Sequence, residues 1–429
     1  MLRNFLIVGG ASAYAPGLVN ALIEDADRHH LEMVRLYDIA ADRLDVVERL
    51  CRGLSRSAGS PFRIEATTDM ADAVEDVDIL LNSSRPGGFE CRLIDETLPL
   101  EFGIPGQETV GPGGFFFALR SIPAAMKLAD QVSRRAPEAI WLNYTNPTNI
   151  VGQALCDETD LDVIALCDQS DEDMRALADA LGYGKKAPYR FRCSGLNHAT
   201  WYRDISIAGE PLGDAIYTAE PPPYYDVEHR RRFAYCADMA QRLNGPWPNS
   251  YLPYYEYPQS FVALSREQGT RTEAILEGLN AYYRHFREQA ARPDPELTHY
   301  RGSAGFGDMA AEVLAALSSA EPKDVVLNIP NGGLNEAFDD ATVVEAFVSL
   351  SRSGVERRAA PPLPDASRPL LDQLETYQRR TARAATSGDH NQMVHALASN
   401  PLVDCRSTAE KLLERARVTY GDGLPQFSS

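Results

Sequence analysis

A cysteine and an aspartate stand side by side at Cys167 and Asp168, directly after the apolar run LDVIAL, which predicts a buried strand. His198 follows in the segment GLNHAT. A thiolate and an imidazole can hold a divalent ion while its other positions stay open to substrate oxygens. On spacing alone, a buried structural cysteine and a hydrogen-bonded histidine remain the simpler interpretation.

A glycine-rich turn lies at the other end of the chain, in NFLIVGGASAYAPGLV. A strand, a glycine turn and a helix in this order direct backbone N–H groups at a pyrophosphate. The turn departs from G-x-G-x-x-G at Ala11 and Tyr14, so a plain strand-to-helix turn stays open as an alternative. Asp38 ends the next apolar run, where a carboxylate can bind the ribose hydroxyls of NAD and repel the extra phosphate of NADP. The pattern therefore favours NAD.

The elements that must position these residues alternate through the first 170 residues. Apolar runs that predict strands are separated by helical patterns such as DRLDVVERLCRGL, which indicates parallel βαβ units and a doubly wound, Rossmann-like sheet. After about residue 190 this alternation is lost. There ISIAGEPLG predicts a hairpin, and residues 271–291 and 366–417 predict helices. We expect an α/β fold with a Rossmann-like domain over 1–195 and a mixed, mostly helical α+β domain over 196–429.

Composition limits the classes of partner. The net charge of −19 argues against nucleic acid and anionic membranes as partners, so an anionic ligand would need a local cluster of arginines. Seven cysteines without a C-x-x-C pair indicate neither a disulfide framework nor a zinc ribbon. No apolar run is long enough to span a bilayer, and the N-terminus predicts a strand rather than a signal peptide, so a cytoplasmic protein is expected.

Several segments resemble the NAD-dependent glycosidases of glycoside hydrolase family 4 and their close relatives, and occur in that family's order. They are IVGGASAYAPGLV, RPGGFECRLIDETLPLEFGIPGQETVGPGGFFFALRSIP, NYTNPTNIV, CDQS, GLNHATW, SYLPYYEYP, TRTEAILEG and LNIPNGG. The resemblance covers most of the chain. It implies a fold similar overall to lactate and malate dehydrogenases, two cofactors (NAD and a divalent ion, typically manganese), and assembly into a homodimer or homotetramer.

The resemblance also implies roles for individual residues. Cys167 and His198 fall on the two protein ligands of the metal, Asp168 on the general acid of α-glucoside-cleaving members, and Tyr251 on the catalytic base, with Tyr254 as the alternative. The implied cofactor-binding residues are Gly9, Gly10, Ser12, Ala13, Tyr14, Asp38, Arg85 and Asn146. The implied substrate-binding residues are Arg92, Asn146, Asn197, His198 and Arg271. Arg92 can instead pair with Asp95 or Glu96, and Arg120 is expected to be structural.

The family mechanism removes hydride from C3 of the sugar to NAD, so that a base can take the proton on C2 and the C1 substituent leaves by elimination. Water then adds and the hydride returns. A tyrosine base needs its phenol pKa lowered by a nearby cation, and burial would raise the pKa of an acid at Asp168. Asp168 favours an α linkage and Arg271 a C6 anion, either a phosphate or a sulfonate. Three alternatives stay open: a 2-hydroxyacid dehydrogenase of the lactate/malate type, a family 4 enzyme for neutral or uronate sugars, and a non-catalytic NAD sensor.

Overall fold

The computed structural model describes residues 2–301 and 306–424 of the chain. Its N-terminal half contains parallel strands in the order β3-β2-β1-β4-β5-β6, which is the Rossmann order and agrees with the predicted doubly wound sheet. These strands are β1 (Asn4–Val8), β2 (Met33–Tyr37), β3 (Arg63–Thr67), β4 (Ile79–Asn82), β5 (Ile140–Asn143) and β6 (Asp162–Ala165). Strand β4 is buried at every position, as expected for a parallel strand covered by helices on both faces.

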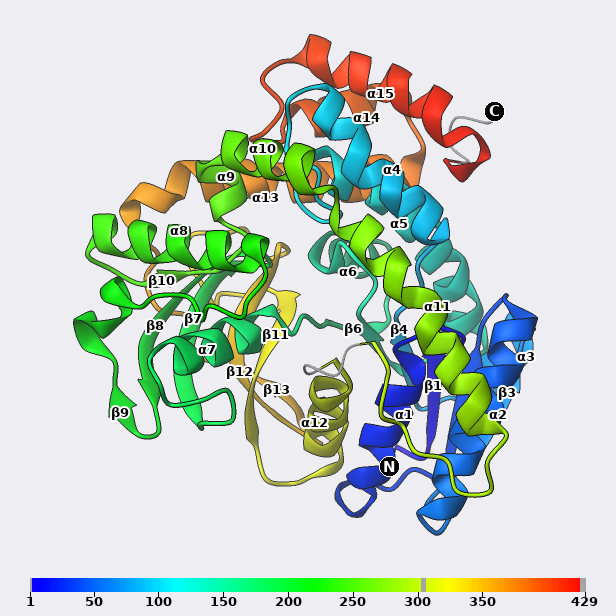
Figure 1. The fold of residues 1–429 in the computed structure, drawn as a ribbon. Helices are drawn as coiled ribbons and strands as arrows, with labels where there is room; N and C mark the ends of the chain where they lie inside the picture. Colours follow the sequence, from blue (N-terminus) through cyan, green and yellow to red (C-terminus); the bar gives the residue numbers. More distant parts are fainter. Residues whose placement is uncertain (1, 302–305, 425–429) are drawn as a thin grey trace.

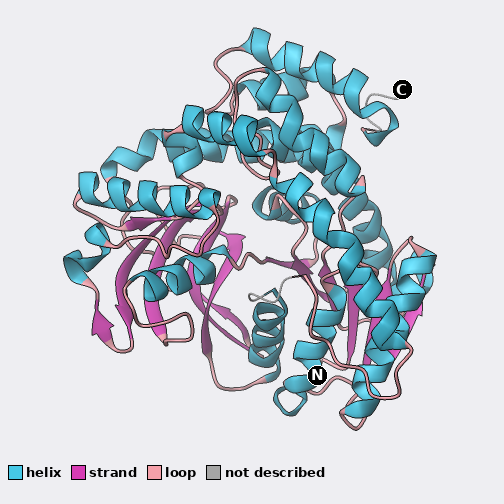
Figure 2. Cartoon of the chain, viewed as in Figure 1, coloured by secondary structure: helices cyan, strands magenta, loops and turns pink. Residues whose placement is uncertain are grey.

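Helices connect these strands and cover the sheet (Figure 2). They are α1 (Ala15–Glu24), α2 (Ala41–Ser57), α3 (Met70–Ala73), α4 (Gly88–Glu101), α5 (Gly111–Arg135), α6 (Thr148–Glu158) and α7 (Gln169–Ala180). Helix α2 illustrates the apolar periodicity that predicted these helices. Its apolar residues recur at helical spacing and are all buried, namely Leu44, Val47, Leu50 and Leu54. The predicted strand–helix alternation is confirmed.

The sheet continues into the second half of the chain, where the strands become antiparallel. Strand β11 joins β6 through the pairing of Asn328 with Ala165, and β12, β7, β8 and β10 follow in that order. The strands are β7 (Tyr189–Leu196), β8 (Ala199–Ile207), β9 (Glu210–Pro211), β10 (Trp247–Pro248), β11 (Lys323–Pro330), β12 (Val343–Ser351) and β13 (Gly354–Glu356). The predicted hairpin is the β8–β9 turn. The β11–β12 hairpin was not predicted, because periodicity does not separate short apolar runs in strands from those in helices.

The remaining helices pack mainly on the outside of this sheet and on the N-terminal helices (Figure 1). They are α8 (Val227–Leu243), α9 (Pro253–Glu256), α10 (Pro258–Gln268), α11 (Arg271–Ala290), α12 (Phe306–Ser318), α13 (Arg368–Ser387), α14 (His390–Ala398) and α15 (Arg406–Tyr420). Helix α11 begins with a capping box in which Thr270 and Glu273 exchange hydrogen bonds. The predicted helices over 271–291 and 366–417 correspond to α11 and to α13–α15. In the described ranges, none of the helices is both long and apolar enough to cross a bilayer.

Sheet topology determines where the predicted site residues meet. Because β1, β2, β4, β5 and β6 are parallel, their carboxyl ends share one edge, and Gly9, Asp38, Tyr144 and Cys167 all follow strands at that edge. The domain boundary expected at 195/196 falls at the end of β7, inside a sheet that continues across it. That boundary stays a prediction.

Candidate active site

The pair formed by Cys167 and His198 lies at the carboxyl end of β6. Cys167 Sγ is 3.5 Å from His198 Nε2, and both side chains are buried. His198 sits in the two-residue turn between β7 and β8 with φ of 63°, a backbone conformation that is costly for a residue with a Cβ and is held by the flanking strands.

The orientation of the imidazole follows from its second nitrogen. Thr109 Oγ1 donates to Gln107 Oε1 at 2.8 Å, so the same hydroxyl accepts from His198 Nδ1 at 3.1 Å. The lone pair of Nε2 then faces Cys167. Burial lowers the pKa of His198 to about 3, with Arg232 acting in the same direction, so the ring is neutral at pH 7.

This pair fits a shared divalent ion. Bonds of about 2.3 Å to sulfur and about 2.1 Å to nitrogen at a near-tetrahedral angle separate the two atoms by about 3.6 Å, close to the 3.5 Å observed. In the described part of the chain, no group of three or more His, Cys, Asp or Glu side chains is arranged to hold a metal. Two protein ligands would leave the remaining positions to substrate and water.

Tyr251 lies directly against this pair. Its ring stacks on His198 with centroids 4.0 Å apart and planes within 5°, and the Arg232 guanidinium carbon lies 4.9 Å from the Tyr251 centroid. Burial raises the pKa of the Tyr251 phenol above its ordinary value, and Arg232 acts in the opposite direction. Burial therefore outweighs the effect of Arg232, which differs from the lowered phenol pKa that the chemistry requires. A bound cation would have to lower the pKa of the Tyr251 phenol further.

Tyr254, the alternative base, is engaged elsewhere. Its hydroxyl donates to Glu228 Oε1 at 2.5 Å, and its ring centroid lies 5.9 Å from that of Tyr251. The geometry favours Tyr251 over Tyr254 as the tyrosine beside the Cys167–His198 pair.

A cavity of about 280 Å³ gathers most of the predicted residues. Those on its wall are Tyr14, Arg85, Arg92, Asn146, Cys167, Asp168, His198, Tyr251 and Arg271. Asp168 is the N-cap residue of α7, and burial raises the pKa of its carboxyl, as expected for a proton donor. Asn197 is not among the lining residues; its Nδ2 donates to Glu345 Oε1 at 3.4 Å. Its predicted contact with substrate stays a prediction.

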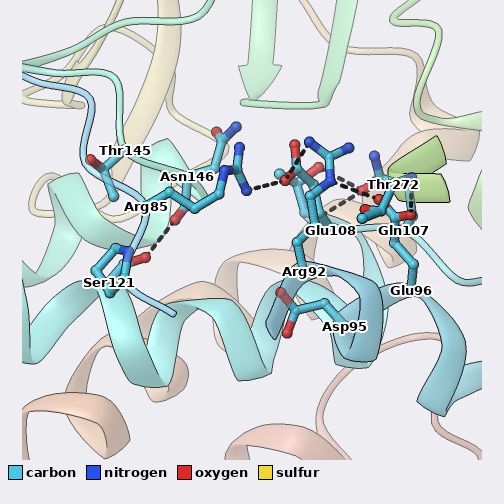
Figure 3. A network of polar contacts seen from close by, with 12 residues as sticks. Arg85, Arg92, Asp95, Glu96, Gln107, Glu108, Ser121, Thr145, Asn146 and Thr272 are labelled. Atoms are coloured by element: carbon cyan, nitrogen blue, oxygen red, sulfur yellow. Dashed lines mark hydrogen bonds and ion pairs between the residues drawn. The ribbon is translucent and has the colours of Figure 1, made fainter. Parts of the chain in front are cut away.

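Arginines and glutamates form a network along one side of the cavity (Figure 3). Glu108 Oε2 accepts from Arg85 at 2.5 Å and lies 3.2 Å from Arg92 Nη1, and Arg92 Nε also donates to Glu96 at 2.9 Å. Burial acts to raise the pKa of Glu108, but Arg85 and Arg92 outweigh it and hold that pKa at about 2. Arg92 thus pairs with Glu96, as the sequence allowed, and also with Glu108.

Asp95 belongs to a separate buried cluster. Arg120 donates to both of its carboxylate oxygens, at 3.0 and 2.6 Å, and Tyr420 donates to Oδ1 at 2.6 Å. Asp95 and Arg120 do not line the cavity. This agrees with the expected structural role of Arg120.

The glycine turn fits a dinucleotide. Gly9 has φ of 89°, and a Cβ on Gly10 would lie 2.8 Å from Leu36 Cβ, so neither position accepts a larger residue without strain. Asp38 accepts from the backbone N–H groups of Ala11 and Ala40, each at 3.0 Å, which fixes the carboxylate. Ser12 Oγ is buried and has no hydrogen-bond partner among the described residues. A buried orphan hydroxyl at the start of α1 is a suitable contact for a bound phosphate.

Family models match nearly the whole chain. The family 4 glycosyl hydrolase model matches residues 4–183, and the model of that family's C-terminal domain matches residues 193–403. The chain belongs to the family 4 glycosyl hydrolases. The resemblance stated from the sequence is therefore confirmed, and the protein is a glycoside hydrolase.

Proteins named 6-phosphoglucosidases are similar to this chain over nearly their whole lengths. A 6-phospho-α-glucosidase of Lacticaseibacillus paracasei is 28% identical, covering 99% of this chain and 98% of that protein. A 6-phospho-β-glucosidase of Escherichia coli is 26% identical, covering 98% and 96%. The structure of a 6-phospho-α-glucosidase from gut microorganisms, in complex with NAD and Mn²⁺, is 25% identical with a TM-score of 0.90 over 99% of both chains.

The overall resemblance to dehydrogenases is also confirmed at the level of fold. Malate dehydrogenase from Plasmodium falciparum has a TM-score of 0.54 and 12% identity over 90% of this chain and 99% of its own. At this identity the likeness concerns the fold alone.

Sequence reasoning missed several residues of this family 4 site. Arg232 is buried beside Tyr251. In the sequence EHRRRFAYC, however, no feature distinguishes it from the two arginines before it. Glu108 and Thr109, in GQETVG, lie within a segment that carries the resemblance; the glutamate in a glycine-rich loop was the available signal. Arg301 also lines the cavity, with its guanidinium carbon 4.7 Å from the Tyr14 ring centroid.

Proposed function

We propose that this chain is an NAD- and divalent metal-dependent glycosidase that cleaves an α-glucoside carrying an anionic group at C6. One observation carries the proposal: Cys167, His198, Asp168 and Tyr251 meet in one cavity, at the sheet edge where the glycine turn and Asp38 also lie. The NAD and Mn²⁺ bound to the 25% identical 6-phospho-α-glucosidase support the same cofactors here.

The chemistry divides among residues already described. When bound, NAD would accept and return hydride at C3, and a divalent ion held by Cys167 and His198 would stabilise negative charge on the neighbouring sugar oxygens. Tyr251 would take the proton from C2, with its ring fixed against His198. Asp168 would protonate the leaving oxygen, for which a raised pKa is required. Arg92 would contact the sugar and Arg85 the cofactor, and Glu108 holds both arginines in place.

A C6 anion is supported by charge in the cavity. Five arginines line it, namely Arg85, Arg92, Arg232, Arg271 and Arg301, beside the carboxyl groups of Glu96, Glu108, Asp168, Glu172 and Glu228. Burial, followed by the charge of Asp168, raises the pKa of Glu172 to about 8, so at pH 7 the arginines outnumber the ionised carboxylates. Among the described residues, Arg232 and Arg301 form no ion pair within 4.0 Å. The names of the relatives support phosphate; a sulfonate presents similar oxygens and is the second ligand to test.

The test compares hydrolysis of p-nitrophenyl α-glucoside 6-phosphate, p-nitrophenyl α-sulfoquinovoside and p-nitrophenyl α-glucoside, each with and without NAD and Mn²⁺. We expect turnover of an anionic substrate only with NAD, and no net NADH. Product formed equally well without NAD, or one NADH released for each substrate consumed, contradicts the proposal; the second result would indicate a dehydrogenase.

Arg271→Ala tests the C6 anion separately. Arg271 lines the cavity with a half-exposed side chain. Its loss should raise KM for the anionic substrate about 10-fold or more and leave KM for the neutral substrate unchanged. Arg266→Ala is the matched control, because Arg266 lies nearby on α10 and does not line the cavity.

We also propose, from the resemblance, that the protein forms a homodimer or homotetramer and acts in the cytoplasm.

A further inference from the structure

Asp173 is a buried carboxylate one turn into α7, in a position that the proposed chemistry does not use. It is 6% exposed and is within range of the charge of Arg232, but among the described residues it forms no ion pair within 4.0 Å. Neutral donors satisfy it instead. Its Oδ1 accepts from Gln169 Nε2 at 2.9 Å, and its Oδ2 accepts from the Tyr202 hydroxyl at 3.0 Å and from the Ser250 backbone N–H at 3.1 Å.

These contacts lead directly to Tyr251. Asn249 Nδ2 donates to the Tyr202 hydroxyl at 2.8 Å, and Asn249 Oδ1 accepts from the backbone N–H of Tyr251 at 3.0 Å. Gln169 Nε2 also donates to Ser250 Oγ at 3.1 Å. The loop between β10 and α9 is thus tied to this network at Asn249 and Ser250, and Asn249 in turn holds the backbone of Tyr251.

The other end of the network is α7, which starts directly after Asp168. Gln169 is its first residue, and Asp173 follows one turn later on the same face. The acid and the thiol are therefore attached to the same helix end that Asp173 ties to the loop of the base. A proton on carbon is transferred only at short range and in good alignment. The hydrogen bonds between α7 and the loop therefore set where Tyr251 lies relative to Cys167 and Asp168, a distance on which the reaction depends.

We propose that Asp173 and Tyr202 are positioning residues that hold the Tyr251 hydroxyl at the C2 hydrogen of the substrate. The proposal rests on the function proposed above for Tyr251. Asp173 and Tyr202 touch neither substrate nor cofactor; they act through the backbone of residues 249–251. Loss of either should slow proton abstraction from C2 and leave the preceding hydride transfer intact.

Tyr202→Phe in the NAD- and Mn²⁺-loaded enzyme is the direct test. It removes one hydroxyl from a fully buried ring and should lower kcat by about 10-fold or more with little change in KM. During turnover, reduced nicotinamide should accumulate on the enzyme, because its formation is unchanged and its consumption is slowed. The near-ultraviolet absorbance of the bound reduced cofactor reports this directly.

Tyr189→Phe is the matched control. Tyr189 lies on the adjacent strand β7, and its hydroxyl donates to Asp171 on the same helix α7 at 2.8 Å, away from the loop of Tyr251. It should leave both kcat and the level of reduced cofactor at wild-type values. Asp173→Asn is the second variant, and it should shift the same step in the same direction as Tyr202→Phe.

The outcomes separate the two proposals. Wild-type kcat in Tyr202→Phe or Asp173→Asn, or a lower kcat with no extra reduced cofactor, overturns the positioning role. A wild-type enzyme that turns over without NAD overturns the proposed function instead. If one variant fails to fold, the other decides.

Discussion

The imidazole of His198 and the phenol of Tyr251 lie face to face, with ring centroids 4.0 Å apart and planes within 5°. The Arg232 guanidinium lies against the same phenol ring. Cys167 Sγ lies 3.5 Å from Nε2 at the edge of the imidazole. The tyrosine proposed as the base is therefore packed directly on one of the two proposed metal ligands. Predictions about base, acid, metal and cofactor follow from this arrangement.

Tyr251→Phe should keep the stacking and lose the base. Turnover should fall by about 10²- to 10⁴-fold, the usual contribution of a positioned acid or base. Turnover in deuterated water checks the step: the wild type should place deuterium at C2 of the released sugar, and the variant should not. Tyr257→Phe, whose partners are Asp238 and Arg242 at the surface, should behave as the wild type. Product from the wild type without deuterium at C2 contradicts the role of Tyr251.

Asp168→Asn should affect poor leaving groups more than good ones. A p-nitrophenolate leaves without protonation, whereas an alkoxide needs a proton from an acid whose pKa is raised by burial. The ratio of kcat/KM for the p-nitrophenyl glycoside to that for a methyl glycoside should therefore rise in the variant about 10-fold or more. An equal loss for both substrates would argue for a structural role of Asp168.

Cys167→Ser should weaken binding of the divalent ion. The variant replaces a soft, anionic ligand by a hydroxyl, and only His198 then remains of the pair. Direct titration of Mn²⁺ should show an affinity at least about 10-fold lower, and the Mn²⁺ concentration needed for activity should rise in parallel. Cys156→Ser, on α6 and outside the cavity, is the control. Unchanged Mn²⁺ binding in Cys167→Ser would show that the ion is held elsewhere.

Asp38→Asn should weaken NAD binding. A neutral amide loses the charge-assisted hydrogen bonds to the ribose hydroxyls, a loss of about 1.5–3 kcal/mol or roughly 10- to 100-fold in Kd. The Kd of NAD, measured by fluorescence titration, should rise in Asp38→Asn, and discrimination against NADP should decrease. Asp42→Asn, at the exposed start of α2, should change neither. A Kd that stays within twofold of the wild type contradicts this assignment.

Glu345 predicts a pH dependence of stability. Burial raises its pKa from 4.5 to about 7, although Thr200 and Asn197 hydrogen-bond to the carboxylate. The folded state therefore binds the proton more tightly than the unfolded state does, so this contribution to stability is complete below pH 4.5 and is lost as pH rises through about 7. Glu345→Gln carries a neutral amide that does not titrate, so it does not lose this contribution. The free energy of unfolding of Glu345→Gln minus that of the wild type should therefore increase by about 3 kcal/mol as the pH rises from 4.5 to about 7.

Denaturant unfolding of both proteins across this pH range measures the effect. Asp324→Asn, on the surface end of β11, should run parallel to the wild type. Curves for Glu345→Gln and the wild type that also run parallel would contradict a raised pKa at Glu345.

The chain's local patterns determined the Rossmann-like half of the fold, and they identified the glycine turn and the carboxylate expected to bind a dinucleotide. Strand–helix alternation, the Gly9–Gly10 turn and Asp38 depend on short-range periodicity and turn chemistry, which a sequence states directly. The roles of Cys167, His198 and Tyr251 came instead from the resemblance to family 4, because spacing alone left a structural cysteine and a hydrogen-bonded histidine as the simpler interpretation. The β11–β12 hairpin was not predicted, because periodicity does not separate short apolar runs in strands from those in helices.

Only the tertiary structure decided which charges are buried and what each one faces. Arg232, Glu108 and Asp173 look like ordinary charged residues of helices and loops, yet each is buried beside the site. It also placed Tyr251 rather than Tyr254 against His198. The reason is physical: pKa, desolvation and hydrogen-bond partners depend on neighbours brought together by packing of distant segments, and no local pattern of residue types encodes them.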